Sequence, residues 1–144
     1  MFFQYLSCYS DFFKTLFRDK FKEGGEDEIV LEEVGYEEML ELLSVIYPSN
    51  APITEKNIEI ILKLVDRFIM PSVLKQCKKE LGILTNTNGA MKLLLAQRYN
   101  FTDSQILLAQ QYKTVEAVKK LKSEPEYKLL NKNTLAIILN SIGS

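Results

Sequence analysis

The 144-residue chain contains no histidine. Histidine is the most common general base and the most common metal ligand in proteins, so the usual catalytic and metal-binding arrangements are not available. The sequence also lacks a Gly-rich phosphate loop, a GxSxG nucleophile turn and an HExxH zinc motif. We therefore expect no enzyme activity, no cofactor, no metal site and no small-molecule substrate.

Cysteine is scarce: Cys8 and Cys77 are the only two, and they do not form a CxxC pair. Both fall at apolar positions of helical patterns, which predicts buried free thiols in a reducing compartment. Met1-Phe2-Phe3 is apolar, but neither a basic n-region nor a small-residue cleavage site follows, so we expect no signal peptide. These observations predict an intracellular protein of the cytoplasm or the nucleus.

Long apolar runs and an excess of charge of one sign are also missing. No run approaches the ~20 apolar residues that span a bilayer. The net charge is −1, too small to attract nucleic acid or an anionic membrane. We expect neither of them as a partner. With 47% apolar and 26% charged residues, the composition is typical of a globular protein that buries a core.

The first 31 residues predict two helices, a loop and a short strand. Apolar residues recur at helical spacing from residue 1 to residue 17, and Ser10 is placed to cap the second helix. Residues 18–28 are charged and contain Gly24-Gly25, which predicts a loop. The acidic run there lacks the spacing of calcium ligands, so we expect it to be solvated. Residues 29–31 (IVL) predict the strand.

Helices are predicted for the rest of the chain. The first begins at Gly35 and ends at Pro48, the next is capped by Thr54, and a third begins at Pro71 and ends at Gly82. Shorter helices follow at residues 90–99, 103–112 and 114–121, after Pro125, and up to Gly143. The positions expected to be apolar faces are Tyr36, Met39, Leu40, Leu43, Ile46 and Tyr47; Ile58, Ile61, Leu62, Val65, Phe68 and Ile69; Val73 or Leu74 with Cys77 and Leu81; and Leu135, Ile138, Leu139 and Ile142.

Two further patterns concern the surface and an internal repeat. Glu37, Glu38 and Glu41 lie opposite the apolar face of their helix, which predicts that they face solvent. Residues 64–68 (LVDRF) match residues 95–99 (LAQRY), and each segment ends one helix before a short turn. We therefore expect the same helical hairpin to be used twice.

The sharpest candidate for an interaction site is Phe21-Lys22-Glu23. The pattern places this aromatic residue in a charged loop, beyond the helix that Phe17 completes. In one interpretation Phe21 folds back onto that helix. In the other it is an exposed apolar anchor next to a charge, which is typical of an interface hot spot.

An ordered set of residues in the first part of the chain resembles a known family. The set comprises Leu6-Ser7 with Ser10, Phe12-Phe13, Leu16-Phe17, Ile29-Val30-Leu31, Tyr36 with Leu40 and Leu43, Ile46-Tyr47-Pro48, Leu62 with Val65-Asp66-Arg67-Phe68, and Cys77. In this order and spacing it resembles a BTB (POZ) domain, with the MATH-BTB adaptors as the closest subfamily. Residues 92–99, 113–116 and 125–128 resemble the helical tail of that subfamily, so the resemblance covers nearly the whole chain.

The resemblance implies a mostly α fold with an α+β remnant. Residues 1–84 are expected to form the BTB helical core with one short strand, and residues 85–144 a C-terminal helical extension. Family domains begin with a β-hairpin before the first helix, whereas Met1 falls inside that helix. We therefore expect an N-terminally incomplete BTB domain, without the MATH domain of such adaptors.

BTB domains of this kind are non-enzymatic substrate adaptors of cullin-3 ubiquitin ligases, in the ubiquitin conjugation pathway. Their cullin-binding motif is a hydrophobic residue, any residue, then glutamate, in the loop before the third strand, and Phe21-Lys22-Glu23 fits it. The resemblance implies that Phe21 inserts into an apolar groove on the cullin and that Glu23 helps to fix the loop.

The resemblance also implies a homodimer, because BTB domains commonly dimerise through their first helices. The apolar residues available for such self-association are Phe2, Phe3, Tyr5, Leu6 and Phe13, unless some of them fill the core instead. Two alternatives to a cullin adaptor stay open: a BTB scaffold that oligomerises or recruits corepressors without a cullin, and an inert or dominant-negative fragment.

Overall fold

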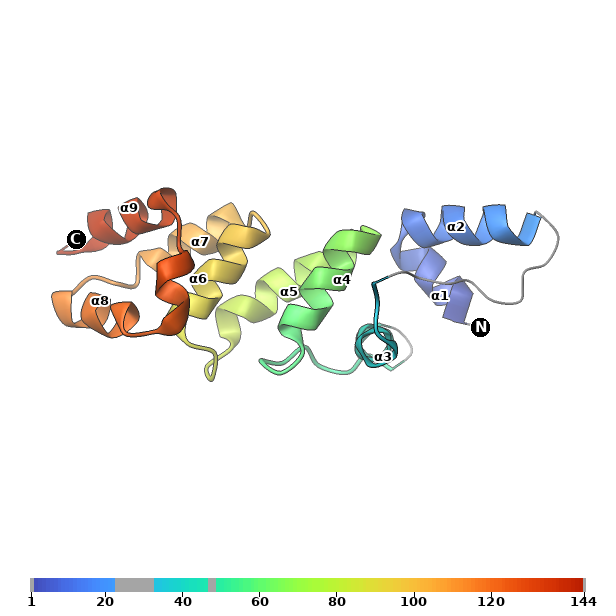
Figure 1. Cartoon of the computed structure of the whole chain (residues 1–144), viewed down its shortest axis with the longest axis horizontal. Helices are drawn as coiled ribbons and strands as arrows, with labels where there is room; N and C mark the ends of the chain where they lie inside the picture. Colours follow the sequence, from blue (N-terminus) through green and yellow to red (C-terminus); the bar gives the residue numbers. More distant parts are fainter. Residues whose placement is uncertain (1, 23–32, 47–48, 144) are drawn as a thin grey trace. The chain divides into compact units, whose positions relative to one another are not determined.

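The computed structural model describes residues 2–22, 33–46 and 49–143, and over these ranges it is built from nine α-helices and one 3-10 helix, with no strand. The prediction of a mostly helical fold is therefore confirmed, and the predicted strand of residues 29–31 lies outside the described residues. The chain forms two compact units, Met1–Cys77 and Lys78–Ser144, which are described separately (Figure 1).

The helices follow the order of the sequence. The first unit contains α1 (Phe2–Tyr9), α2 (Asp11–Lys22), α3 (Tyr36–Val45) and α4 (Ile58–Phe68), and α5 (Pro71–Ile83) begins in it and ends in the second unit. The second unit contains α6 (Gly89–Arg98), α7 (Thr102–Ala109), α8 (Val115–Lys122), η1 (Pro125–Leu129) and α9 (Lys132–Ser141).

Ser10 separates α1 from α2, and its side chain makes two hydrogen bonds. The backbone N–H of Phe13 donates to Ser10 Oγ at 3.3 Å, which confirms the predicted cap of the second helix. The hydroxyl in turn donates to the carbonyl oxygen of Phe68, the last residue of α4. Ser10 is buried, so one side chain both begins α2 and joins it to the end of α4.

Aromatic rings fill the space around this hydrogen bond. The ring centroid of Phe13 lies 4.6 Å from that of Phe68, 5.6 Å from that of Phe17 and 5.4 Å from that of Phe12. These separations are in the range of favourable aromatic pairs. Phe13 and Phe68 are among the most deeply buried residues of the chain, so this aromatic cluster is the core that fixes α2 against α4.

The second helix is longer than predicted. We expected a loop from residue 18, but α2 continues through Lys22, so Phe21 and Lys22 belong to its last turn. The reason is that Arg and Lys are good helix formers, and charge alone does not end a helix. Gly24-Gly25, the stronger breaker, lies outside the described residues.

The predicted inner face of α3 is wrong at two of its positions. Tyr36 is 79% exposed and Leu40 is 46% exposed, whereas the buried residues of this segment are Leu42, Val45 and Ile46. The helix is rotated because its acidic side faces α4 and finds polar partners there. Of the pattern expected to be apolar, Ile46 is buried and Tyr47 lies outside the described residues.

The start of α4 and the end of α5 also differ from the predictions. α4 begins at Ile58 with Asn57 as its N-cap, not directly after Thr54. Thr54 and Asn57 instead close the preceding turn, since the N–H of Thr54 donates to Asn57 Oδ1 at 2.8 Å and that of Lys56 to Thr54 Oγ1 at 3.3 Å. Gly82 does not end α5, which continues to Ile83, because an isolated glycine is tolerated within a helix.

Individual apolar positions also differ from the predicted pattern. Cys77 is buried as predicted, but Cys8 lies on an exposed part of α1. Ile69 and Leu139 were expected in apolar faces and are both exposed. Ile69 leaves the helical pattern because it is the left-handed C-cap that follows α4, and Leu139 lies at the edge of the stripe of α9, whose buried residues are Thr134, Ile138 and Ser141.

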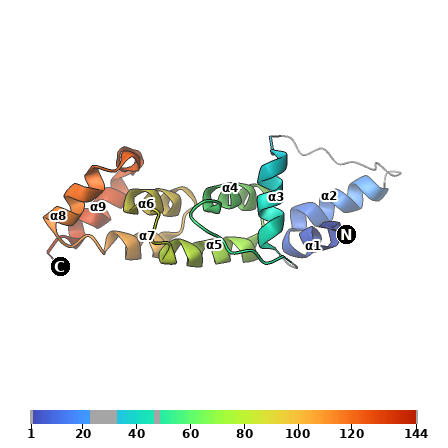
Figure 2. The ribbon, with the colours of Figure 1, turned by 90° about the horizontal axis from the view of Figure 1, so that it is seen from below.

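The internal repeat is confirmed at the turns that end α4 and α6. Ile69 and Asn100 occupy the same position after the matching segments, with φ of 52° and 60°. The next residue closes each turn in the same way, because Met70 N–H donates to Val65 O at 3.2 Å and Phe101 N–H donates to the carbonyl oxygen five residues before it at 2.8 Å. Figure 2 shows α6 returning into the antiparallel α7 through the second of these turns.

We expect Ser10→Ala to destabilise the protein by about 2 kcal/mol, because it removes a helix cap and leaves the buried carbonyl of Phe68 without its donor. Urea unfolding followed by circular dichroism measures the change. Ser7→Ala, on the neighbouring turn of α1, is the matched control and should change stability by less than about 0.5 kcal/mol. An equal effect of the two substitutions would contradict the role assigned to Ser10.

The left-handed turns allow a reciprocal pair of substitutions. A β-branched residue in this region of φ is strained by about 1 kcal/mol, whereas asparagine tolerates it. Because Ile69 is 63% exposed, Ile69→Asn should raise the free energy of unfolding by about that amount, and Asn100→Ile should lower it similarly. The same urea titration tests both; a loss of stability in Ile69→Asn would show that contacts of Ile69 outweigh the strain.

Candidate protein-interaction surface

The predicted cullin motif lies at the end of α2. The backbones of Phe21 and Lys22 form the last turn of this helix, and Glu23 lies outside the described residues. The side chains of Phe21 and Lys22 are likewise outside the described part. The structure therefore gives the helix that carries the motif, and it replaces the predicted loop with a helix end for two of the three residues.

The position of that helix end is set by the aromatic core. Phe13 and Phe17 lie on α2 at i and i+4, both buried, with their rings stacked. Phe21 follows Phe17 by another four residues, one helical turn further on. Since the preceding turns are fixed by packing and by Ser10, the last turn extends from a rigid base.

A second surface of the first unit lies on α3, where polar contacts hold the helix to α4. Lys63 Nζ donates to Glu38 Oε2 at 3.2 Å, and Asn57 Nδ2 contacts Glu41 Oε2 at 3.5 Å. Both glutamates were expected to face solvent, and both are half-buried instead. Their contacts place Tyr36 and Leu40 on the outside. The sequence analysis missed this exposed pair; the only hint of it was that acidic residues recur at the same helical spacing as the apolar ones.

The residues proposed for self-association divide into two groups. Leu6 is 4% exposed and Phe13 is 1% exposed, so the chain buries both within its first unit. Phe2, Phe3 and Tyr5 are on α1, and their side chains lie outside the described part. Of the two roles left open by the sequence, the single chain thus gives Leu6 and Phe13 the role of core residues.

In the second unit, Tyr112 packs over the beginning of α6. A Cβ atom on Gly89 would lie 1.7 Å from Tyr112 Oη, so only glycine fits beneath this phenol. The Glu124 carboxylate accepts the N–H of Ala90 at 3.3 Å, where a negative charge complements the helix dipole. Burial, and to a smaller extent the nearby Glu124 charge, raises the pKa of Tyr112. This arrangement explains how the α6–α7 pair is held; it offers no reactive group.

Among the described residues, no group of three or more His, Cys, Asp or Glu side chains is arranged to hold a metal ion. In the same ranges, no helix is long and apolar enough to span a bilayer.

Comparison with known proteins identifies the first unit. The BTB/POZ domain family matches residues 4–82. BTB and MATH domain-containing protein 38 of Caenorhabditis elegans is 34% identical over 138 residues, which are 96% of this chain and 36% of the relative. Protein 36 of the same series and organism is 34% identical over 139 residues, again 96% of this chain and 43% of the relative.

The chain is also similar to Kelch-like proteins. Kelch-like protein 6 of Homo sapiens is 29% identical over 136 residues, 94% of this chain and 22% of the relative. No solved structure matched the chain. The chain spans less than half the length of each of these curated relatives. The matched residues contain the aromatic core, the helix that carries the predicted motif and the α3 surface. This chain therefore belongs to the BTB/POZ domain family.

Proposed function

We propose that this chain is a non-enzymatic adaptor module that binds a cullin-3 scaffold through Phe21, Lys22 and Glu23 and that associates with a second copy of itself. The observation that carries the proposal is the BTB/POZ match over residues 4–82, which includes this hydrophobic-x-Glu motif. BTB domains are protein-interaction modules, and the MATH-BTB and Kelch-like relatives are of the adaptor type.

The structure supports the proposal through the rigidity of α2. An interface anchor loses less entropy on binding when its backbone is already ordered. The core contacts of Phe13 and Phe17, together with the Ser10 hydrogen bonds, order the helix up to the turn that bears Phe21. The mechanism is positioning: the chain would hold the scaffold and a bound substrate close together, and no bond is made or broken by its own residues.

The cullin proposal predicts that Phe21→Ala weakens binding by about 2 kcal/mol, a loss of about 30-fold in Kd. Titration calorimetry with the N-terminal region of cullin-3 measures this, and Glu23→Ala should also weaken binding. Lys14→Ala, an exposed lysine two turns earlier on α2, is the matched control and should leave the affinity unchanged. Unchanged affinity in both Phe21→Ala and Glu23→Ala would reject this site. Absence of any binding by the unaltered protein would favour the scaffold without a cullin.

For self-association, we propose a face on α1 that includes Phe2, Phe3 and Tyr5, with Leu6 and Phe13 supporting it from beneath. Light scattering after gel filtration should show a dimer at micromolar concentration. Phe3→Asp should give a folded monomer, because a charge in an apolar interface is costly. Phe13→Asp is the contrasting variant and should unfold the first unit. A monomer in the unaltered protein would contradict the proposal.

A further inference from the structure

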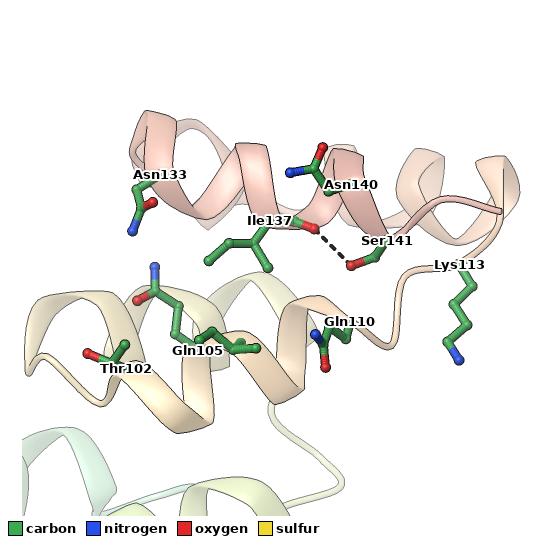
Figure 3. A pocket seen from close by; sticks show the side chains of 9 residues that line it. Thr102, Gln105, Gln110, Lys113, Asn133, Ile137, Asn140 and Ser141 are labelled. Atoms are coloured by element: carbon green, nitrogen blue, oxygen red, sulfur yellow. Dashed lines mark hydrogen bonds between the residues drawn. The ribbon is translucent and has the colours of Figure 1, made fainter. Parts of the chain in front are cut away.

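The second unit contains a groove between α7 and α9 that has no counterpart in the proposed function. The two helices are in contact, and the groove between them has a volume of about 690 Å³. Residues between Thr102 and Gln110 on one side and between Asn133 and Ser141 on the other line it, and Ile106 and Ile137 fall in the middle of these two segments. Figure 3 shows Gln105 and Asn133 facing each other from opposite helices, with Ile137 between the helices.

Uncharged carboxamides dominate this groove. Gln105, Gln110, Asn133 and Asn140 all line it. Gln105 is buried and uses its Nε2 to donate to Thr134 Oγ1, which anchors it. Within residues 2–22, 33–46 and 49–143, the carboxamides of the other three make no hydrogen bond. Each of them can donate and accept, so three complete amide groups are available to a ligand.

This chemistry matches a peptide main chain. A carboxamide pairs with one N–H and one C=O, which are the groups that an extended peptide presents along its length. From Thr102 to Gln110 the helix rises about 12 Å, the length of about four residues of extended peptide. The exposed edge of Ile106 and the half-buried Ile137 provide an apolar floor for one side chain at the centre.

The positive formal charge of the second unit favours an acidic peptide over a basic one. Lys113 is the only charged residue among those that line the groove, and its backbone oxygen accepts the N–H of Gly143 at 2.8 Å, which holds this end of the groove together. Lys78–Ser144 contains ten Lys and Arg and five Asp and Glu, a formal charge of +5, whereas Met1–Cys77 contains eight and fourteen, a formal charge of −6. A positive unit attracts an acidic ligand.

We propose that the α7–α9 groove binds an extended acidic peptide segment, through main-chain hydrogen bonds to Gln110, Asn133 and Asn140, an apolar side chain over Ile106 and Ile137, and a carboxylate at Lys113. The peptide belongs to a partner protein, and its binding is independent of the cullin motif on α2. The second unit would then be a recruitment site in its own right.

Fluorescence anisotropy tests this with the full chain and a labelled heptapeptide in which three valines lie between two pairs of glutamates. We expect saturable binding that weakens strongly at about 1 M salt, where the Debye length is about 3 Å. A peptide with lysines in place of glutamates, and one with alternate main-chain amides N-methylated, should each bind at least about tenfold more weakly. Equal binding of either control peptide would overturn the proposal.

Variants locate the site. Asn133→Ala and Asn140→Ala should each weaken the heptapeptide about fivefold, since each removes a neutral hydrogen-bonding partner, while Gln76→Ala, an exposed amide on α5, should not. Lys113→Glu should weaken it more than Lys119→Glu, which changes net charge equally from outside the groove. Undiminished binding in Asn133→Ala, Asn140→Ala and Lys113→Glu would overturn the proposal. So would an affinity that falls when the protein concentration rises, because that would mean that a second copy covers the groove.

Discussion

The contact between α2 and α4 is the interaction on which the first unit depends. The Ser10 side chain accepts the N–H of Phe13 and donates to the carbonyl of Phe68, so the start of one helix and the end of another share a single hydroxyl. The rings of the same two phenylalanines lie 4.6 Å apart around it. A buried polar group is tolerated only when it is fully paired, and here the pairing also fixes the register between helices.

This constraint also bears on which side chains the first unit presents to solvent. Phe21 follows the buried turns of α2, and Tyr36 and Leu40 are turned outward because Glu38 and Glu41 face α4. In the second unit the same principle recurs: Gln105 is anchored by Thr134, and the neighbouring amides remain available. In each case a paired polar side chain that is at least half-buried holds the helix that presents the exposed residues.

Much of the helical structure could be predicted because its signals are local. Ser10, Gly35 and Pro71 act through neighbouring residues, and the helices that start beside them are as expected. The repeated turn at Ile69 and Asn100 was visible as matching sequence. Two kinds of position were misassigned. Charged residues in the last turn of α2 were predicted to form a loop, and apolar residues of α3 that are exposed were predicted to lie in the core.

The sequence by itself determined which segments are helical, where most of them begin, and that the chain resembles a BTB domain, since capping, periodicity and ordered residue sets are properties of the linear chain. Only the tertiary structure decided which face of α3 is buried and which amides of α7 and α9 meet in a groove. Either side of an amphipathic helix can be buried, and contacts with other helices decide which one is. Lys63 pairs with Glu38 although the two residues lie 25 positions apart in the chain, and no local sequence pattern encodes such a pairing.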